Sequence, residues 1–262
     1  IALFNQQTMA LSALIDGNRV TGLRTAATAA LAVDLLAPQR PLRVGVIGAG
    51  FEARGALDCL KSVRDVARVR VFSPTPASRE RFAESFRPGL DIQAVGTAQE
   101  AVQDCDVLIC AARSRDESPV LQGAWLSAGT TVVSLGSTLP EQREVDPATM
   151  DRAVCIVADM PQEVLHDTGD AIAAISAGVY VADKLVALSD LVAGRVSPRH
   201  HQPAVEPEDV HAAVRDDRGH RTRAARPQHG TGNARDTLGI HRRRGVRHRL
   251  HPGRSCRQPS LR

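Results

Sequence analysis

The stretch RVGVIGAGFEA, residues 43–53, decides which fold this sequence predicts. Residues 44–47 form a short, largely apolar run, which is typical of a strand buried in a parallel sheet. Gly48 and Gly50 follow and leave the backbone bare where the chain turns into a helix. A bare turn lets a pyrophosphate reach the amides at the start of that helix. The stretch therefore predicts a strand, a glycine turn and a helix that together bind a dinucleotide.

The glycine pattern G-x-G-x-x-A is weak evidence when taken alone, because a tight turn without a ligand can also show it. Its surroundings favour the dinucleotide. Ala53 occupies the third fingerprint position, where helix and strand pack closely, and an amphipathic run over residues 56–63 continues the helix. We therefore expect a cofactor to contact six consecutive residues: Gly48, Ala49, Gly50, Phe51, Glu52 and Ala53.

Strands and helices alternate along the middle of the chain. We expect strands over 43–47, 68–73, 91–95, 106–111, 130–135 and 153–158, and helices over 21–36, 51–64, 77–86, 97–103 and 182–192. This alternation indicates crossover helices between parallel strands, and so predicts an α/β fold with a doubly wound parallel sheet of the Rossmann type. Ligands of such sheets bind beyond the carboxyl ends of the strands. One crevice should therefore be lined by the loops that follow Ile47, Phe72, Ala111 and Leu135.

The same patterns divide the chain into four parts. Residues 1–19 resemble a hairpin, and because an isolated hairpin is marginal in water, we interpret them as the remnant of a substrate or dimerisation domain. Residues 20–38 form a connecting helix, 39–198 the dinucleotide-binding domain, and 199–262 a basic tail. The first residue is Ile rather than Met, so we expect the chain to be a piece of a longer gene product.

The tail differs sharply in composition from the rest of the chain. Residues 199–262 hold 15 arginines, no lysine, 6 acidic residues and 8 of the 9 histidines, which gives the tail a net charge of +9 and the remainder −5. A nucleic-acid-binding arm and a disordered native tail are both possible interpretations. The lack of lysine favours a third, translation of GC-rich DNA out of frame. We expect no nucleic-acid partner and no folded structure in this segment.

Several classes of protein are excluded by what the sequence lacks. No run of 18 apolar residues is present, so we expect no membrane span, and no signal peptide is visible. The five cysteines have no metal-binding spacing, and we predict no metal site. A reduced, cytoplasmic setting is the expectation.

Four separate motifs occur in one order: LRTAA (23–27), VIGAG (46–50), SLGSTLP (134–140) and REVD (143–146). Together they resemble the ornithine cyclodeaminase/mu-crystallin family. The resemblance covers residues 1 to 198 and fails from about Arg199. It implies a nicotinamide-binding domain that faces a substrate domain, of which some ninety residues would precede this chain.

Members of that family include ornithine cyclodeaminase, alanine dehydrogenases and reductases of cyclic imines. The resemblance therefore implies NAD or NADP as the cofactor and a small imino or amino acid as the substrate. Full-length members form homodimers through the preceding region, so for this chain a dimer is not expected.

The resemblance assigns roles to two residues of the expected helix over 21–36. Arg24 would bind the substrate carboxylate, since a guanidinium forms two parallel hydrogen bonds with such a group; the alternative is a surface or capping arginine. Thr25 would contact a cofactor phosphate, because helix N-termini hold anions; the alternative is ordinary chemistry of a helix start.

The end of the second strand bears on the choice between NAD and NADP. An NAD site usually has an acidic residue there, but no acid occurs between residues 68 and 78. Ser73 and Thr75 are neutral and Arg79 is close by, which favours NADP because a carboxylate would repel its 2′-phosphate. For Arg79 the alternative, a solvated helix face, is slightly preferred.

The nicotinamide end should be formed by Ala111 and Ala112 after the fourth strand, and by Gly136, Ser137 and Thr138 after the fifth. Cyclodeaminases of the family carry Asp at the position of Thr138, and a hydroxyl cannot replace its proton transfer. Glu144 in the next loop is interpreted as a structural carboxylate rather than a functional one. His166 could act as a general acid, but an exposed helix histidine is the preferred interpretation.

These residues predict an NAD(P)-dependent oxidoreductase that moves hydride to or from a small imino or amino acid. Ornithine cyclisation with loss of ammonia is the second hypothesis for the chemistry. Two further hypotheses involve no turnover: a module that only binds a dinucleotide, and an inactive truncated product. The sequence identifies no catalytic acid or base.

Overall fold

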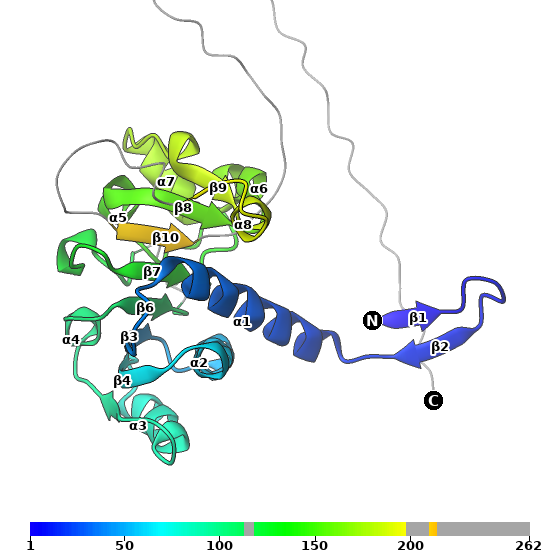
Figure 1. Ribbon diagram of the computed structural model, residues 1–262, viewed down its shortest axis with the longest axis horizontal. Coiled ribbons are helices and arrows are strands. Elements are labelled where there is room, and N and C mark those ends of the chain that lie inside the picture. The colour runs from blue at the N-terminus through cyan, green and yellow to red at the C-terminus, as the bar shows by residue number, and fades with distance from the viewer. Residues whose placement is uncertain (113–117, 198–209, 214–262) are drawn as a thin grey trace, which may run out of the picture. The chain divides into compact units, whose positions relative to one another are not determined.

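The computed structural model describes residues 1–112, 118–197 and 210–213. Its main feature is an eight-stranded sheet in which all neighbouring strands are parallel. The strands lie in the order β5-β4-β3-β6-β7-β10-β8-β9 (Figure 1). Their bounds are β3 Leu42–Ile47, β4 Val66–Phe72, β5 Ile92–Ala94, β6 Val107–Cys110, β7 Thr131–Ser134, β8 Ala153–Ala158, β9 Leu185–Ala187 and β10 Val210–Ala213.

The order of the strands confirms the doubly wound arrangement. From β3 the chain moves outward to β4 and β5, then returns to the other side of β3 and continues through β6 and β7. The direction of winding therefore reverses between β3 and β6. In open sheets of this kind the ligand crevice opens at the carboxyl ends of the strands beside that reversal.

Helices cover both faces of the sheet. Apolar side chains alternate along each central strand, so that Val107 and Ile109 of β6 face one cluster while Leu108 and Cys110 face another. The first cluster includes side chains of α1 (Gly17–Leu36), α2 (Phe51–Val63) and α3 (Pro76–Phe86). The second includes side chains of α4 (Ala98–Val102), α5 (Pro147–Arg152), α6 (Pro161–Asp167) and α7 (Gly169–Ser176).

The expected helix over residues 182–192 is wrong. A 3-10 turn, η2 (Ala182–Lys184), leads into strand β9, and only α8 (Leu188–Val192) is an α-helix. An apolar run of this length is compatible with a helix or a strand. Residues 185–187 form a strand because they pair with β8, where Leu185 lies opposite Ile156. Sequence patterns gave no bounds for the short helices α5, α6 and α7, although His166 was expected on a helix. The signal for α5 was present, since Asp146 caps it and Pro147 begins it.

The expectation that nothing after Pro198 folds does not hold for Val210–Ala213. This segment forms β10, which is inserted between β7 and β8 and pairs with both of them. Composition predicted no structure because the tail is poor in apolar residues. A strand in the middle of a sheet forms backbone hydrogen bonds with both of its neighbours. These bonds stabilise the strand whatever its side chains are, so composition does not predict them.

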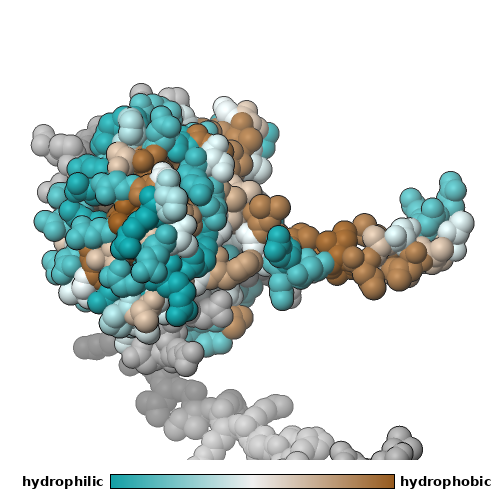
Figure 2. Space-filling view, turned by 90° about the horizontal axis from the view of Figure 1, so that it is seen from below, coloured by the Kyte–Doolittle hydropathy of each residue, from teal (hydrophilic) through white to brown (hydrophobic). Residues whose placement is uncertain are grey.

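The expected hairpin at the start of the chain is confirmed. β1 (Ala2–Phe4) and β2 (Leu11–Leu14) pair antiparallel. Its large apolar residues are exposed, and Figure 2 shows them as a brown surface along the hairpin; they include Ile1, Leu3, Phe4, Leu11 and Leu14. Among the described residues, no helix combines the length and the hydrophobicity that crossing a membrane requires.

Candidate functional site

The four loops expected to line one crevice start at neighbouring strands. β4, β3, β6 and β7 are adjacent, and register pairs Ile47 with Phe72 and with Cys110, and Cys110 with Ser134. The carboxyl ends of these strands therefore form one continuous edge of the sheet. This edge brings together the predicted cofactor residues of the glycine turn, the second strand end and the fourth and fifth strand ends.

Gly48 is required by the fold itself. Its φ of +110° lies in the region that side chains disfavour, and a Cβ there would collide with the carbonyl oxygen of Ala111. Its amide donates to the carbonyl of Phe72 at 2.8 Å. Gly48 thus allows the ends of β3, β4 and β6 to pack closely together.

Gly50 differs from Gly48, because open space surrounds it. A Cβ added at Gly50 would find no described atom within 4 Å. Gly50 is the N-cap residue of α2, and the first hydrogen bond of the helix runs from the Arg54 amide to the Gly50 carbonyl at 3.1 Å. The amides of residues 51–53 come before that bond, so they remain available to an anion.

The next three predicted residues have different environments. The ring of Phe51 lies against Gly22 of α1, where an added Cβ would collide with it. Glu52 lies in the first turn of α2, where the helix dipole favours a negative charge. Ala53 is fully buried, as the close packing of helix and strand demands.

Arg79 is anchored at the end of β4. Its Nη1 donates to the carbonyl of Ser73 at 3.0 Å, and its guanidinium lies 5.9 Å from the centre of the Phe72 ring. Arg79 is half-buried, so it is not the freely solvated helix arginine that the sequence slightly favoured. Thr75, also predicted to contact the cofactor, is the exposed N-cap residue of α3.

Hydrogen bonds within the protein fix the loops that are predicted to contact the nicotinamide. The Ala111 amide donates to the carbonyl of Ile47 at 2.8 Å. Ser137 is buried, and its hydroxyl donates to the Gln142 carbonyl at 3.1 Å. Thr138 is exposed, and both its amide and its hydroxyl donate to the side-chain oxygen of Gln142, at 2.9 and 3.0 Å.

Glu144 ties the ends of β6 and β7 together. Its carboxylate accepts hydrogen bonds from four groups: the Ala112 amide (2.7 Å), the Ser134 hydroxyl (2.6 Å), the Leu135 amide (2.8 Å) and the Gly136 amide (2.7 Å). Complete burial raises the pKa of Glu144, and these four donors act in the opposite direction. The interpretation of Glu144 as a structural carboxylate fits these bonds.

Asp170 supports Glu144 from α7. Its Oδ1 accepts a hydrogen bond from the Glu144 amide at 2.8 Å, and its own amide donates to the Ser137 hydroxyl at 3.1 Å. Burial, followed by the charge of Glu144, raises the pKa of Asp170 to about 7. Two buried carboxyl groups thus lie directly behind the loop that begins at Gly136. No sequence pattern connected Asp170 with this loop.

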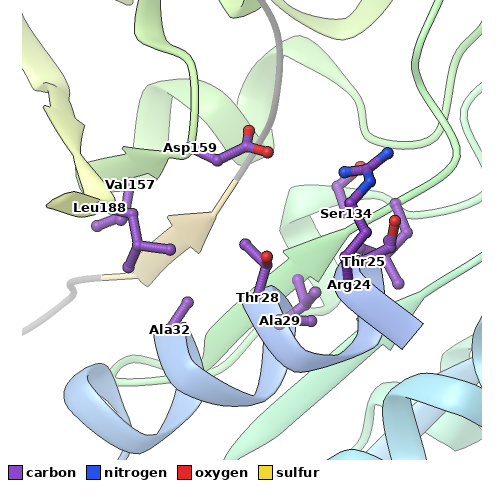
Figure 3. A pocket seen from close by; sticks show the side chains of 11 residues that line it. Arg24, Thr25, Thr28, Ala29, Ala32, Ser134, Val157, Asp159 and Leu188 are labelled. Carbon is purple, nitrogen blue, oxygen red and sulfur yellow. The ribbon is translucent and has the colours of Figure 1, made fainter. Parts of the chain in front are cut away.

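A pocket opens between α1 and the ends of β7 and β8. Its polar lining residues are Arg24, Thr25 and Thr28 of α1, Ser134 of β7 and Asp159 after β8 (Figure 3). It encloses about 410 Å³ of empty space, including the part open to solvent. The described residues that line it are Arg24, Thr25, Thr28, Ala29, Ala32, Val133, Ser134, Leu135, Val157, Asp159 and Leu188.

The position of Thr25 in its helix is not the one expected. α1 begins at Gly17, with Asp16 as its N-cap, rather than near Thr21. Thr25 therefore lies in the helix interior, where its amide is not one of the free amides at a helix start. Only its hydroxyl could contact a phosphate. Arg24 remains an exposed residue at the mouth of the pocket.

His166 lies on α6 and is exposed, which agrees with the preferred interpretation of its sequence context. In the part of the chain that the structure describes, no group of three or more His, Cys, Asp or Glu side chains could hold a metal ion.

Comparison with known proteins identifies the relatives of this chain. The profile of the ornithine cyclodeaminase/mu-crystallin family matches residues 1–206. The chain belongs to this family. Its curated relatives include the ketimine reductase mu-crystallin of Macropus fuliginosus, which is 28% identical over 216 residues, covering 82% of this chain and 65% of the relative. The chain thus spans slightly less than two thirds of that relative's length.

Solved structures of similar proteins share the fold. The Thermococcus litoralis Δ1-pyrroline-2-carboxylate reductase, solved with NADH and L-proline, superposes with a TM-score of 0.72 at 30% identity, over 82% of this chain and 65% of the other. The iminosuccinate reductase of Paracoccus denitrificans, solved with NAD⁺, gives 0.70 at 27% identity, over 82% and 64%. The doubly wound sheet of this family member is therefore a Rossmann-type nicotinamide-dinucleotide fold.

Proposed function

We propose that this protein is an NAD(P)-dependent oxidoreductase that transfers hydride to or from a small imino or amino acid. The observation that carries the proposal is the turn at residues 48–50. Gly48 closes the ends of three strands, whereas Gly50 leaves open space before the free amides of α2. A fold alone would need only the first of these glycines.

The residues present fit a dinucleotide. The amides of residues 51–53 would hold the pyrophosphate, and the absent side chain of Gly50 would let it approach them. The ends of β6 and β7 would receive the nicotinamide, which supplies or accepts the hydride when bound. Two relatives in the same family were solved with NADH or NAD⁺, and that supports the same class of cofactor here.

We further propose a preference for NADP over NAD. Arg79 is half-buried and anchored at the end of β4, where its positive charge could face a 2′-phosphate. The acidic residue that usually selects NAD is absent between residues 68 and 78.

Arg24 is the proposed anchor for the substrate carboxylate. It lies at the mouth of a pocket whose walls are mostly apolar and whose far side carries Asp159. A guanidinium on one side and a carboxylate on the other suit a small zwitterionic or iminium substrate. Thr138 in place of a carboxylate supports a reductase or dehydrogenase rather than a cyclodeaminase.

Two further features belong to the proposal. Homodimerisation is proposed for the whole protein by resemblance to the family. A cytoplasmic location is proposed because nicotinamide cofactors and small imino acids would be available there.

Binding of the cofactor to the protein tests the proposal. Trp125 is the sole tryptophan, so titration with NADH or NADPH should quench its emission and excite the reduced nicotinamide by energy transfer. We expect saturable binding of both, with tighter binding of NADPH. Loss of that preference in Arg79→Gln would support the role of Arg79. Absence of saturable binding by either cofactor would contradict the proposed function.

Turnover is measured separately, as oxidation of the reduced cofactor in the presence of pyrroline-2-carboxylate. The matched variant is Arg24→Gln, which should raise KM for the imino acid by at least about tenfold while cofactor affinity stays the same.

A further inference from the structure

Glu144 places a buried carboxyl group behind the ends of β6 and β7. The carboxylate is fully buried, and the four groups that donate to it, three amides and one hydroxyl, carry no formal charge. Neutral donors stabilise an anion without cancelling its field at longer range. When Glu144 is ionised, the strand ends that these donors belong to therefore lie in a negative potential.

The position of this charge is fixed by the backbone of Glu144. Its amide donates to Asp170 at 2.8 Å, and its carbonyl accepts from the amides of Val120 and Leu121, each at 3.0 Å. A Cβ added to Gly136 would collide with the Glu144 carboxylate. One layer of backbone therefore separates the charge from whatever lies on the outer side of Gly136.

Two other charged groups lie close to Glu144. Asp170 adds a second carboxylate, and half-buried Arg143 opposes it, since the charge of Arg143 lowers the pKa of Asp170. The guanidinium of Arg143 also donates to the carbonyls of Pro140 and Gln142. Arg143 offsets one of the two carboxyl groups. Glu144 is the one that contacts the loop directly, since it accepts from the Gly136 amide at 2.7 Å, so it has the largest effect on the potential there when it is ionised.

We propose that Glu144 makes the site prefer the oxidised nicotinamide over the reduced one. This inference rests on the proposed function, because it requires a nicotinamide at the ends of β6 and β7. The oxidised ring carries a positive charge, which the arrival of a hydride removes. A fixed negative charge within several ångströms therefore favours the oxidised form, by roughly tenfold at the effective dielectric of a protein interior.

The preference has a chemical consequence. If the protein binds the oxidised cofactor more tightly than the reduced one, the bound reduced cofactor becomes a stronger hydride donor than it is in water. Glu144 contacts neither the cofactor nor the substrate in this scheme. It acts through the potential at the strand ends, as a positioning and tuning residue.

The test compares the affinities of the protein for the two redox forms. NADH binding is titrated through energy transfer from Trp125, and NAD⁺ binding is measured by competition against NADH. In Glu144→Gln, which keeps the shape but removes the charge, we expect the ratio Kd(NAD⁺)/Kd(NADH) to rise about tenfold. A merely structural role would weaken both affinities in parallel and leave the ratio unchanged.

A matched control separates the charge of Glu144 from buried charge elsewhere. Asp106→Asn removes another buried carboxylate, which is held by Arg40 and Arg43 before the start of β6, at the opposite ends of the strands. It should leave the ratio unchanged.

Each outcome decides between the two proposals. An unchanged ratio in a folded Glu144→Gln protein overturns this inference and leaves the proposed function intact. If the wild-type protein binds neither form, both fail. If Glu144→Gln does not fold, Arg143→Gln provides the test with the opposite sign: loss of the cation should lower the ratio by about two- to threefold, and no change would overturn the inference.

Discussion

Gly48 and Gly50 are two residues apart, and the structure uses their missing side chains for different purposes. Gly48 has a positive φ and presses against the backbone of Ala111, so it is needed to join the strands. Gly50 has a φ of −87°, which any residue can adopt, and its missing side chain faces open space. One glycine thus serves the fold, and the other leaves the open space that we propose a cofactor occupies.

Substituting each glycine by alanine should separate the two purposes. Gly48→Ala adds backbone strain and a collision with Ala111, and we expect it to lower the free energy of unfolding by at least about 2 kcal/mol. Gly50→Ala should leave the stability within about 0.5 kcal/mol and weaken NADH binding. Urea unfolding and Trp125 titration measure the two effects. Equal loss of stability in both variants would contradict the distinction.

Small residues form the contact between helices α1 and α2. Gly22 of α1 faces the ring of Phe51, which is the first residue of α2. Gly55 of α2 lies close to Ala26 of α1: a Cβ added to Gly55 would be 3.4 Å from the Ala26 Cβ. Small residues allow the two backbones to approach closely. This contact sets the position of the start of α2 relative to α1, and therefore of the proposed pyrophosphate site relative to Arg24.

A double-mutant cycle can measure this contact. Gly22→Ala gains about 1 kcal/mol of helix propensity but collides with the Phe51 ring, so alone it should change stability little. In the Phe51→Ala background the collision is gone, and the same substitution should stabilise the protein by about 1 kcal/mol. Additive effects in urea unfolding would show that the ring does not restrict residue 22.

Buried carboxyl groups lie at both edges of the sheet and give the whole molecule two opposite responses to pH. Burial tends to raise the pKa of Asp106, but hydrogen bonds from Arg43 and Arg40 outweigh it and lower the pKa to about 2. Burial raises the pKa of Asp170 to about 7, although the hydrogen bond that it accepts from the Glu144 amide acts in the opposite direction. The two groups therefore bind protons differently on folding.

The signs follow from these shifts. Asp106 contributes stability above its unfolded pKa of 3.8, and that contribution is lost as pH falls towards 2. The folded protein binds more protons at Asp170 than the unfolded chain between pH 3.8 and about 7, so stability falls as pH rises through this window. We expect Asp170→Asn to flatten that fall, as measured by urea unfolding from pH 4.5 to 8. An unchanged slope would contradict the assignment.

Local sequence patterns were enough to predict the parallel α/β architecture and the strand ends at which a crevice was expected. Alternating apolar runs predicted the parallel sheet, and the stretch over 43–53 predicted the glycine turn, because local periodicity and backbone freedom depend on near neighbours in the chain. The motifs around Arg24 and Gly136 also indicated the family. These features are local, so they could be found without tertiary contacts.

Contacts between residues far apart in the chain could be found only in the folded molecule. Residues 185–187 form a strand because they pair with β8. Val210–Ala213 pair with β7 and β8, although the composition of the tail predicted no folded structure. Glu144 and Asp170 are 26 residues apart, and no periodicity connects them. Their burial, their bonds and their charge at the strand ends arise from packing between separate elements, which sequence patterns do not record.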